Sequence, residues 1–424
     1  MLAGLEGPSL GHAVTRLHIV GGGWAGLSAA VHGVLAGHEV CLYDMAPQLG
    51  GRARQVNWGH LELDNGQHIL TGACTHTLSL MSLVGADPET VLYRTPLQFT
   101  TPSGRMAPWL AHPGRWQRLM GLLSCSMLNW RERWAWLQCI VQLQWSRPAS
   151  WHGKTAADWL AMNAHWTVQP WLEALCVSAM NLPASQADAT VFLNLMQTSF
   201  ESPQASDLLL PKVSLSELLP HRAADWLRAR GAQVQLGQRI TDLNPLLDTG
   251  RVVLACSAQE AARLSSGLSP EWSDMAQHIE HGPIATVYTR WSGSAPQLMD
   301  PLVIMPPGLD SPAQVVMDLG CLRASPQYGG IWSWVISFAQ VDREEAARLV
   351  LQQAQSVWGR QPEVVACFLD PRATILCRPG LKRPGHHVGP GVWACGDYVE
   401  SDLPSTLEGA IRSGLQVIEA IQSH

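Results

Sequence analysis

The segment Leu17–Gly26, LHIVGGGWAG, decides the fold of this chain. Its first four residues form an apolar run typical of a buried strand, and helical periodicity begins at Leu27. Between the two, Gly21, Gly23 and Gly26 form a G-x-G-x-x-G pattern. In this pattern the first glycine allows a tight turn, the second lets backbone approach a pyrophosphate, and the third lets helix and strand pack closely. The segment therefore predicts a helix N-terminus that binds the pyrophosphate of a dinucleotide.

A second strand and an acidic residue follow in the order that a dinucleotide-binding unit requires. The run Glu39–Tyr43 is strand-like, and Asp44 comes 18 residues after Gly26. A carboxylate at this distance binds a ribose hydroxyl and disfavours a 2′-phosphate, so FAD or NAD is expected rather than NADP. A glycine-rich turn without a ligand is the alternative, because glycine punctuates many loops. The ordered set of strand, glycines, helix, strand and acid favours dinucleotide binding.

Length and composition indicate a globular protein with more than one domain. A chain of 424 residues exceeds one ordinary core, so two domains are expected. Hydrophobic residues make up 46% and charged residues 15%, and the net charge of −6 gives no support for nucleic-acid binding. The 10 cysteines are scattered without a C-x-x-C pair, which fits a reducing cytosol. No metal site, signal peptide or membrane-spanning segment is expected.

The middle of the chain divides into a helical part and a part with strands. From about Thr75 to Ser199 the pattern is mostly helical. Later segments read as strands at Ile284–Tyr288, Val315–Asp318, Ile331–Ser337 and Glu363–Phe368, with an amphipathic helix at Arg343–Trp358.

A second strong signal lies near the C-terminus. Val392–Cys395 reads as a buried strand, Gly396 and Asp397 as a turn, and a helix begins near Pro404. Asp397 could hold a ribityl hydroxyl, and the helix would direct free N–H groups at the edge of a flavin ring. Asp397 could equally cap the turn, since Gly-Asp is ordinary turn chemistry.

Three quoted motifs resemble one family of flavoproteins. IVGGGWAGLSAA…LYDMAPQLGGRAR at the front and VWACGDYVESDLPSTLEGAIRSG at the rear resemble the flavin-containing amine oxidase and phytoene desaturase superfamily. Within it, DNGQHILTG at Asp64–Gly72 is similar to the hydroxysqualene dehydroxylases of bacterial hopanoid synthesis. The resemblance covers the full length. Asp44 is a mild departure, because relatives more often have Glu there.

The resemblance implies an α/β fold in two domains. One is a Rossmann-like FAD-binding domain of the glutathione-reductase type, and the other is a discontinuous α+β substrate domain. The expected FAD-binding pieces are 1–75, 205–260 and 370–424, and the expected substrate-binding pieces are 76–204 and 261–369.

The resemblance also implies a set of contacts along the whole FAD molecule. They are Gly21, Gly23 and Gly26 at the pyrophosphate, Asp44 at the adenosine ribose, Ile240 at the adenine, Gly396 and Asp397 at the ribityl-phosphate, and Gly51, Arg52, Thr406 and Leu407 on the flavin side.

The expected activity is reductive removal of the hydroxyl of hydroxysqualene, which gives squalene. Such a reaction needs a proton donor, a dry tunnel and hydride from reduced FAD, which an unidentified electron donor must supply. Asp64 and His68 are the candidate donors, because the family sets their segment beside the flavin. Asp64 could instead be only a turn residue before Asn65-Gly66, and His68 only a packed strand histidine.

Three other functions remain open at this stage. A carotenoid or squalene desaturase would share fold and cofactor but would use FAD as the oxidant. An amine oxidase would need a site for a soluble amine, which the Trp-rich insertion disfavours. A lipid-escort protein on the same fold would bind prenyl groups without flavin, and the intact glycines, Asp44 and Asp397 argue against it.

A basic, tryptophan-rich block predicts contact with a membrane surface. Ten of the 19 tryptophans lie between Trp109 and Trp171, and the stretch from Arg105 to Arg147 holds six arginines and one acid. Core packing is the alternative for residues such as Trp130, Trp134 and Trp145. Because a squalene-sized substrate is insoluble, we expect a cytoplasmic protein that associates peripherally with the inner membrane surface.

Overall fold

A computed structural model describes residues 15–97, 99–101, 104–106, 115–124, 128–202, 204–298, 300–305 and 312–423. Within these residues, six strands form a sheet that is parallel except at one edge. Its order is β10 (Gln233–Leu236), β2 (Glu39–Asp44), β1 (Arg16–Val20), β11 (Arg251–Leu254), β18 (Val392–Ala394) and β17 (His387–Gly389), of which β17 runs antiparallel to β18. Leu17 and Ile19 on one face of β1, and His18 and Val20 on the other, are all buried, as expected for a central parallel strand covered on both faces.

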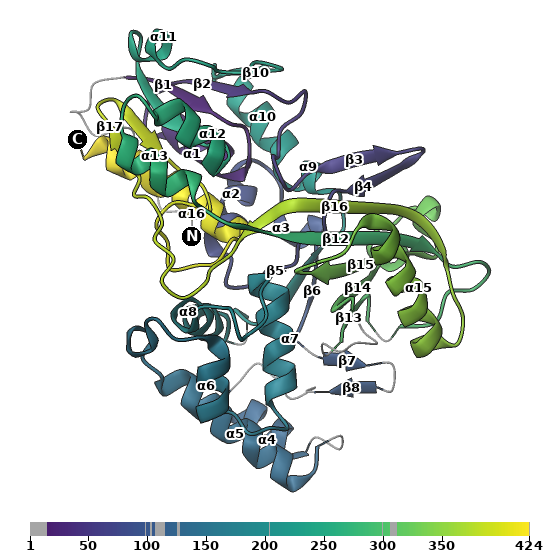
Figure 1. The fold of residues 1–424 in the computed structure, drawn as a ribbon. Coiled ribbons are helices and arrows are strands. Elements are labelled where there is room, and N and C mark those ends of the chain that lie inside the picture. The colour runs from purple at the N-terminus through teal and green to yellow at the C-terminus, as the bar shows by residue number, and fades with distance from the viewer. Residues whose placement is uncertain are drawn as a thin grey trace.

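The first helix and the last helix pack against each other beside this sheet. α1 (Trp24–Leu35) follows β1, and α16 (Leu407–Gln422) ends the described chain. A Cβ atom on Gly414 would lie 2.4 Å from the Ala25 carbonyl oxygen, and the Ser28 hydroxyl donates to the Ile411 carbonyl at 2.7 Å. Because the two helices approach this closely, segments almost four hundred residues apart in sequence lie side by side (Figure 1).

A second sheet is antiparallel and carries its own apolar core. Its order is β13 (Leu302–Ile304), β14 (Val315–Asp318), β15 (Ile331–Ser337), β12 (His281–Arg290) and β16 (Glu363–Ile375). α15 (Arg343–Trp358) packs on it, and Trp291, Trp332, Trp334 and Trp358 meet edge to face or tilted there. The long strands β12 and β16 extend from this sheet toward the first one (Figure 1).

Among the described residues, the expected helical part contains seven α-helices: α2 (Thr75–Leu83), α3 (Pro88–Val91), α4 (Arg115–Ser124), α5 (Trp130–Trp145), α6 (Ala156–Asn163), α7 (Gln169–Met180) and α8 (Ala189–Ser199). Capping boxes begin two of them, with Asn129 and Glu132 at α5 and Thr155 and Asp158 at α6. The prediction missed three short strands inside this range: β6 (Leu92–Thr95), β7 (Phe99–Thr101) and β8 (Gly104–Met106). β6 pairs with a strand distant in sequence, β9 (Leu208–Pro211), and β7 and β8 pair with each other as a short hairpin. Helical periodicity could therefore not indicate them.

Short elements connect these parts. They are β3 (Gln55–Trp58), β4 (Leu61–Asp64), β5 (Leu70–Thr71), η2 (Pro148–Trp151), β9 (Leu208–Pro211), α9 (Leu215–Leu218), α10 (Pro220–Arg228), α11 (Asn244–Leu247), α12 (Ala258–Ser265), α13 (Pro270–Gln277), α14 (Leu319–Leu322) and η3 (Pro326–Tyr328). The α/β fold class is as predicted, and the domain boundaries stay a prediction.

Candidate FAD site

A cavity of about 480 Å³ opens at the carboxyl ends of the parallel strands. Ligands of open parallel sheets bind at this edge. All predicted cofactor residues except Gly26 line the cavity: Gly21, Gly23, Asp44, Gly51, Arg52, Ile240, Gly396, Asp397, Thr406 and Leu407. The structure therefore brings together residues that the sequence places in four separate segments.

Each of the three positions of the first motif requires glycine for a different structural reason. Gly21 has φ +117°, and its Cβ would lie 2.5 Å from the Ala255 carbonyl oxygen. A Cβ on Gly26 would lie 1.9 Å from the carbonyl oxygen of Gly21, so this glycine serves helix–strand packing behind the cavity. A Cβ on Gly23 would meet no atom closer than the Gly51 Cα at 3.9 Å. Gly23 thus keeps space free beside the N-terminus of α1, where a pyrophosphate is expected.

Backbone N–H groups orient the Asp44 carboxylate at the end of β2. One oxygen accepts from the Gly22 N–H at 2.7 Å, and the other accepts from the Ala46 N–H at 2.7 Å. A carboxylate oxygen has a second lone pair, so both oxygens can still accept ribose hydroxyls. This geometry fits the role that the sequence predicts for Asp44.

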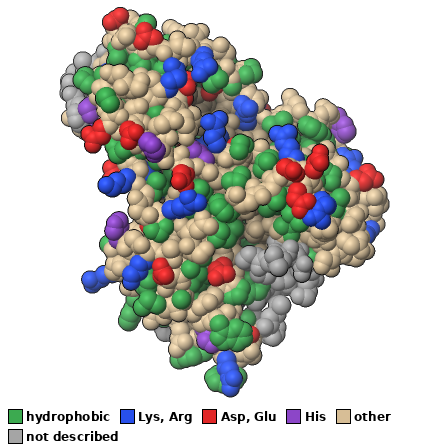
Figure 2. All heavy atoms as spheres, viewed as in Figure 1, with side chains coloured by type: hydrophobic (Ala, Val, Ile, Leu, Met, Phe, Trp, Pro, Cys, Tyr) green, Lys and Arg blue, Asp and Glu red, His purple; other side chains and the backbone are tan. Residues whose placement is uncertain are grey.

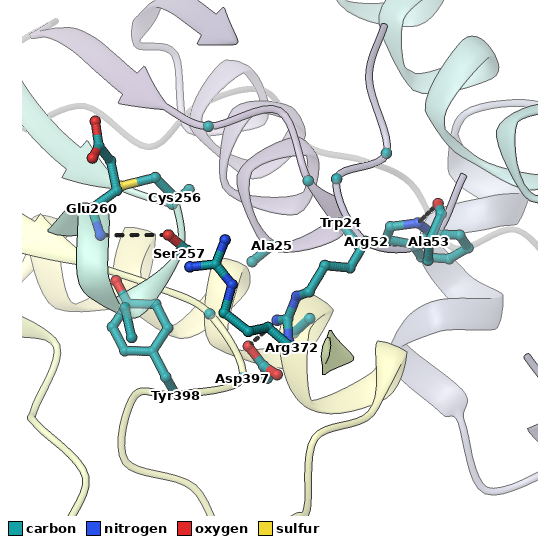
Figure 3. Close-up of a pocket in the computed structure, with 18 of the residues that line it drawn as sticks. Trp24, Ala25, Arg52, Ala53, Cys256, Ser257, Glu260, Arg372, Asp397 and Tyr398 are labelled. Atoms are coloured by element: carbon teal, nitrogen blue, oxygen red, sulfur yellow. Dashed lines mark hydrogen bonds and ion pairs between the residues drawn. The ribbon is translucent and has the colours of Figure 1, made fainter. Parts of the chain in front are cut away.

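An ion pair joins the front motif to the rear motif. Arg52 contacts Asp397 with 2.5 Å between Nη2 and Oδ1, and the Ser405 hydroxyl donates to the other carboxylate oxygen (Figure 3). Burial alone would raise the pKa of Asp397, but Arg52 and Ser405 together hold that pKa below its ordinary value. Asp397 is therefore more than a turn cap, because it links residues 345 positions apart.

Glu408 lies in the first turn of α16 and anchors the start of this helix. The sequence analysis missed it. Its carboxylate accepts from the backbone N–H groups of His76 and Thr77 at 3.0 and 2.9 Å, and from the side chains of both. Glu408 thereby caps α2 from a distant helix. This anchoring holds Thr406 and Leu407 at the cavity wall. The sequence offers no local signal for it, since the partners are more than 330 residues apart.

The two candidate proton donors lie in different surroundings. His68 lines the cavity, and burial followed by the nearby Arg52 charge lowers its pKa to about 4. Asp64 is not among the cavity-lining residues. Its carboxylate contacts Arg323 at 2.6 Å and accepts from the Leu215 N–H at 2.8 Å. Burial raises the pKa of Asp64 to about 6, although Arg323 opposes this shift. Asp64 therefore joins β4 to α9 and to the residue that follows α14.

A further group of cavity residues comes from β16, and the sequence analysis missed it. Asp370, Arg372, Ala373 and Thr374 line the cavity. The strand was expected to end at Phe368 but continues to Ile375. Pro371 obscures this continuation, because proline cannot donate to a strand ladder.

Comparison with known proteins identifies the family of this chain. Residues 24–421 match the family model described as flavin containing amine oxidoreductase. The chain belongs to this family.

Relatives of this flavoprotein support the resemblance seen in its sequence. The chain is 24% identical to a hydroxysqualene dehydroxylase of Sinorhizobium fredii, over 94% of this chain and 96% of the relative. It is 23% identical to a probable zeta-carotene desaturase of Synechococcus elongatus, over 96% and 98%. A crystal structure of an oxidoreductase from Methanosarcina mazei superposes with a TM-score of 0.71 at 15% identity, covering 95% of this chain and 100% of that one.

The flavoprotein is an FAD-dependent oxidoreductase, as the sequence predicted. The cavity fits this cofactor, because Gly23 leaves room beside α1 and the oriented Asp44 carboxylate stands at the end of β2. The assignment of individual residues to parts of FAD stays a prediction.

Proposed function

We propose that this flavoprotein removes the hydroxyl group of hydroxysqualene reductively and releases squalene. The carrying observation is the similarity to hydroxysqualene dehydroxylases along almost the whole chain, which three relatives share at 22–24% identity. The Asp64–Gly72 motif, which resembles the hydroxysqualene dehydroxylases in particular, contains His68, and this residue lines the cavity.

The chemistry of an allylic alcohol sets what the chain must provide. Protonation of the hydroxyl lets it leave as water, and the remaining carbocation is delocalised. Bound reduced FAD supplies the hydride that completes the C–H bond. The net reaction therefore consumes one proton and one hydride and yields squalene and water. An external electron donor must return the two electrons to FAD after each turnover.

We propose His68 as the residue that handles the proton, because it lines the cavity. With a pKa of about 4, its imidazole is neutral near pH 7 and must take up a proton before it can donate one. Asp64 is the less suitable candidate, since Arg323 and the Leu215 N–H already bind its carboxylate.

A desaturase is the second candidate, favoured by the zeta-carotene desaturase relatives. Direction distinguishes the two: a dehydroxylase uses reduced FAD, and a desaturase uses oxidised FAD. The test is a single anaerobic turnover with product analysis. Reduced enzyme with hydroxysqualene should give squalene, with flavin reoxidation at the same rate. Oxidised enzyme that desaturates squalene or a carotene, and reduced enzyme that leaves hydroxysqualene intact, would establish the desaturase instead.

We also propose that the helical part contacts the inner membrane surface from the cytoplasm. Trp130, Trp134 and Trp145 of α5 are 72%, 57% and 80% exposed, so core packing does not account for them. Met162 and Trp166 are exposed nearby in sequence, and the Arg131 guanidinium lies 5.4 Å from the Trp130 ring. Hydrophobic and basic side chains lie together at the lower end of the molecule in Figure 2, where Figure 1 places α4 to α6.

Not every residue of the basic, tryptophan-rich block supports this membrane contact. Arg133 donates to the carbonyls of Leu123 in α4 and Leu128 before α5, so its guanidinium binds the protein backbone rather than facing lipid. The Trp109 residue and the side chains of Arg105, Arg115 and Arg118 lie outside the described part. None of the helices described is both long and apolar enough to cross a bilayer.

A further inference from the structure

We propose that Arg372 binds the diphosphate of FAD from the second sheet and closes the cofactor site opposite the glycine motif. The inference rests on the FAD dependence of the family and not on the identity of the substrate.

Arg372 stands on the wall of the cavity that faces α1. It belongs to β16, the edge strand of the antiparallel sheet, and it lines the cavity. Its side chain extends into the cavity toward Ser257 and Ala25, beside the Arg52–Asp397 ion pair (Figure 3). Ala25 lies in the first turn of α1, and Ser257 is the N-cap of α12. The guanidinium thus points at the positive ends of two helices.

Two of the three other arginines at this cavity differ from Arg372 in how their charge is compensated, whereas Arg54, like Arg372, forms no side-chain ion pair or hydrogen bond among the described residues. Arg52 pairs with Asp397 at 2.5 Å, and Arg239 pairs with Glu260 at 3.4 Å. Within the described residues, the Arg372 guanidinium forms no ion pair or hydrogen bond, while its backbone N–H donates to Asp370 Oδ1 at 2.9 Å. An uncompensated cation that faces two helix N-termini is repelled unless an anion lies between them.

A diphosphate has the charge that this arrangement requires. The glycine motif directs the pyrophosphate of FAD to the N-terminus of α1, and Gly23 keeps space for it. Arginine binds phosphate oxygens through two parallel N–H groups, which a planar guanidinium across the cavity can supply. Because β16 belongs to the second sheet, the cofactor would then hold both sheets together.

The experiment measures FAD release from the holoenzyme. Wild type and Arg372→Gln are diluted into buffers of low and high salt, and the return of free-FAD fluorescence is followed. We expect Arg372→Gln to lose FAD about tenfold faster or more at low salt, because a charge-assisted hydrogen bond is lost. The difference should shrink at high salt, since this contact is partly exposed and screened. Arg372→Lys should fall between the two.

A matched variant and a second ligand make the result specific. Arg343→Gln removes an exposed charge from α15, outside the cavity, and should release FAD like wild type. Full-length chain stripped of FAD is then reloaded with FAD or with riboflavin, which lacks phosphate. Arg372→Gln should weaken FAD binding and leave riboflavin binding unchanged. The phosphate role would be overturned if Arg372→Gln released FAD at the wild-type rate. It would also be overturned if the substitution weakened the binding of FAD and of riboflavin equally. If Arg372→Gln does not fold, the FAD release rate of Arg372→Lys decides.

Discussion

At the scale of single residues, the glycines of the first motif differ in what an added side chain would contact. Gly23 faces open space in the cavity, whereas Gly26 faces the backbone of Gly21. The same substitution should therefore cause a binding defect at one position and a folding defect at the other.

We expect Gly23→Val to fold but to purify colourless, because its side chain would occupy the space beside the N-terminus of α1. Gly26→Ala should instead lower the melting temperature of the FAD-free chain, since its Cβ cannot fit 1.9 Å from a carbonyl oxygen. Gly267→Ala is the control, as no atom lies within 4 Å of a Cβ there. Flavin absorbance per protein and thermal melting measure the two effects. A fully yellow Gly23→Val protein would refute the pyrophosphate assignment.

His68 permits a prediction of pH dependence. Its pKa is lowered to about 4, so at pH 7 only about one molecule in a thousand carries the protonated form. If that form donates to the substrate, the single-turnover rate should rise about tenfold for each pH unit between 7 and 5. His68→Gln should abolish this slope while FAD stays bound. A wild-type rate independent of pH would exclude His68 as the donor.

At the scale of elements, a buried ion pair ties the β4 segment to its neighbours. Arg323 and Asp64 are both almost fully buried, and the Tyr288 hydroxyl of β12 donates to the Asp64 carbonyl at 2.8 Å. Removing one member leaves the other charge buried and unpaired, which is more costly than removing both.

We therefore expect Asp64→Ala to lower the free energy of unfolding of the holoenzyme by about 3–5 kcal/mol. The double variant Asp64→Leu with Arg323→Met should recover a large part of this loss. Urea unfolding of the two variants and wild type measures the difference. The pair interaction would be refuted if the double variant were less stable than Asp64→Ala. Slow turnover by an Asp64 variant would then reflect stability rather than proton donation.

At the scale of the whole molecule, exposed tryptophans concentrate on the helical part. Trp130 and Trp145 lie at the two ends of α5, and Trp166 follows α6. Tryptophan favours the interface between lipid and water, where its ring meets both an apolar and a wet environment.

Replacing Trp130, Trp145 and Trp166 together by Gln should reduce flotation with anionic liposomes severalfold, because these rings provide the apolar contact. Folding should be unaffected, since each of the three is at least 72% exposed. Trp58→Gln is the control: that residue is also exposed, but it lies on β3. High salt should release part of the wild-type protein, as expected for a basic surface. Unchanged flotation of the triple variant would place the contact elsewhere.

The sequence by itself determined the elements whose signals are local. The β1–α1–β2 unit with its glycines, the strands β14 and β15, and the helix α15 match their predicted ranges closely, and the glycine spacing indicated a dinucleotide. Periodicity and turn chemistry are written in neighbouring residues, so they can be read without knowing what packs against them.

Tertiary structure decided which distant residues meet. Asp64 turned out to face Arg323, 259 residues away, and Arg372 came to the FAD cavity on a strand that continues past Pro371. The sequence likewise could not decide whether the α5 tryptophans are buried or exposed, because an aromatic residue at helical spacing suits either a core or a surface. These outcomes depend on how two sheets and a helical part pack, and the free energy of each contact depends on burial and partners that no local pattern encodes.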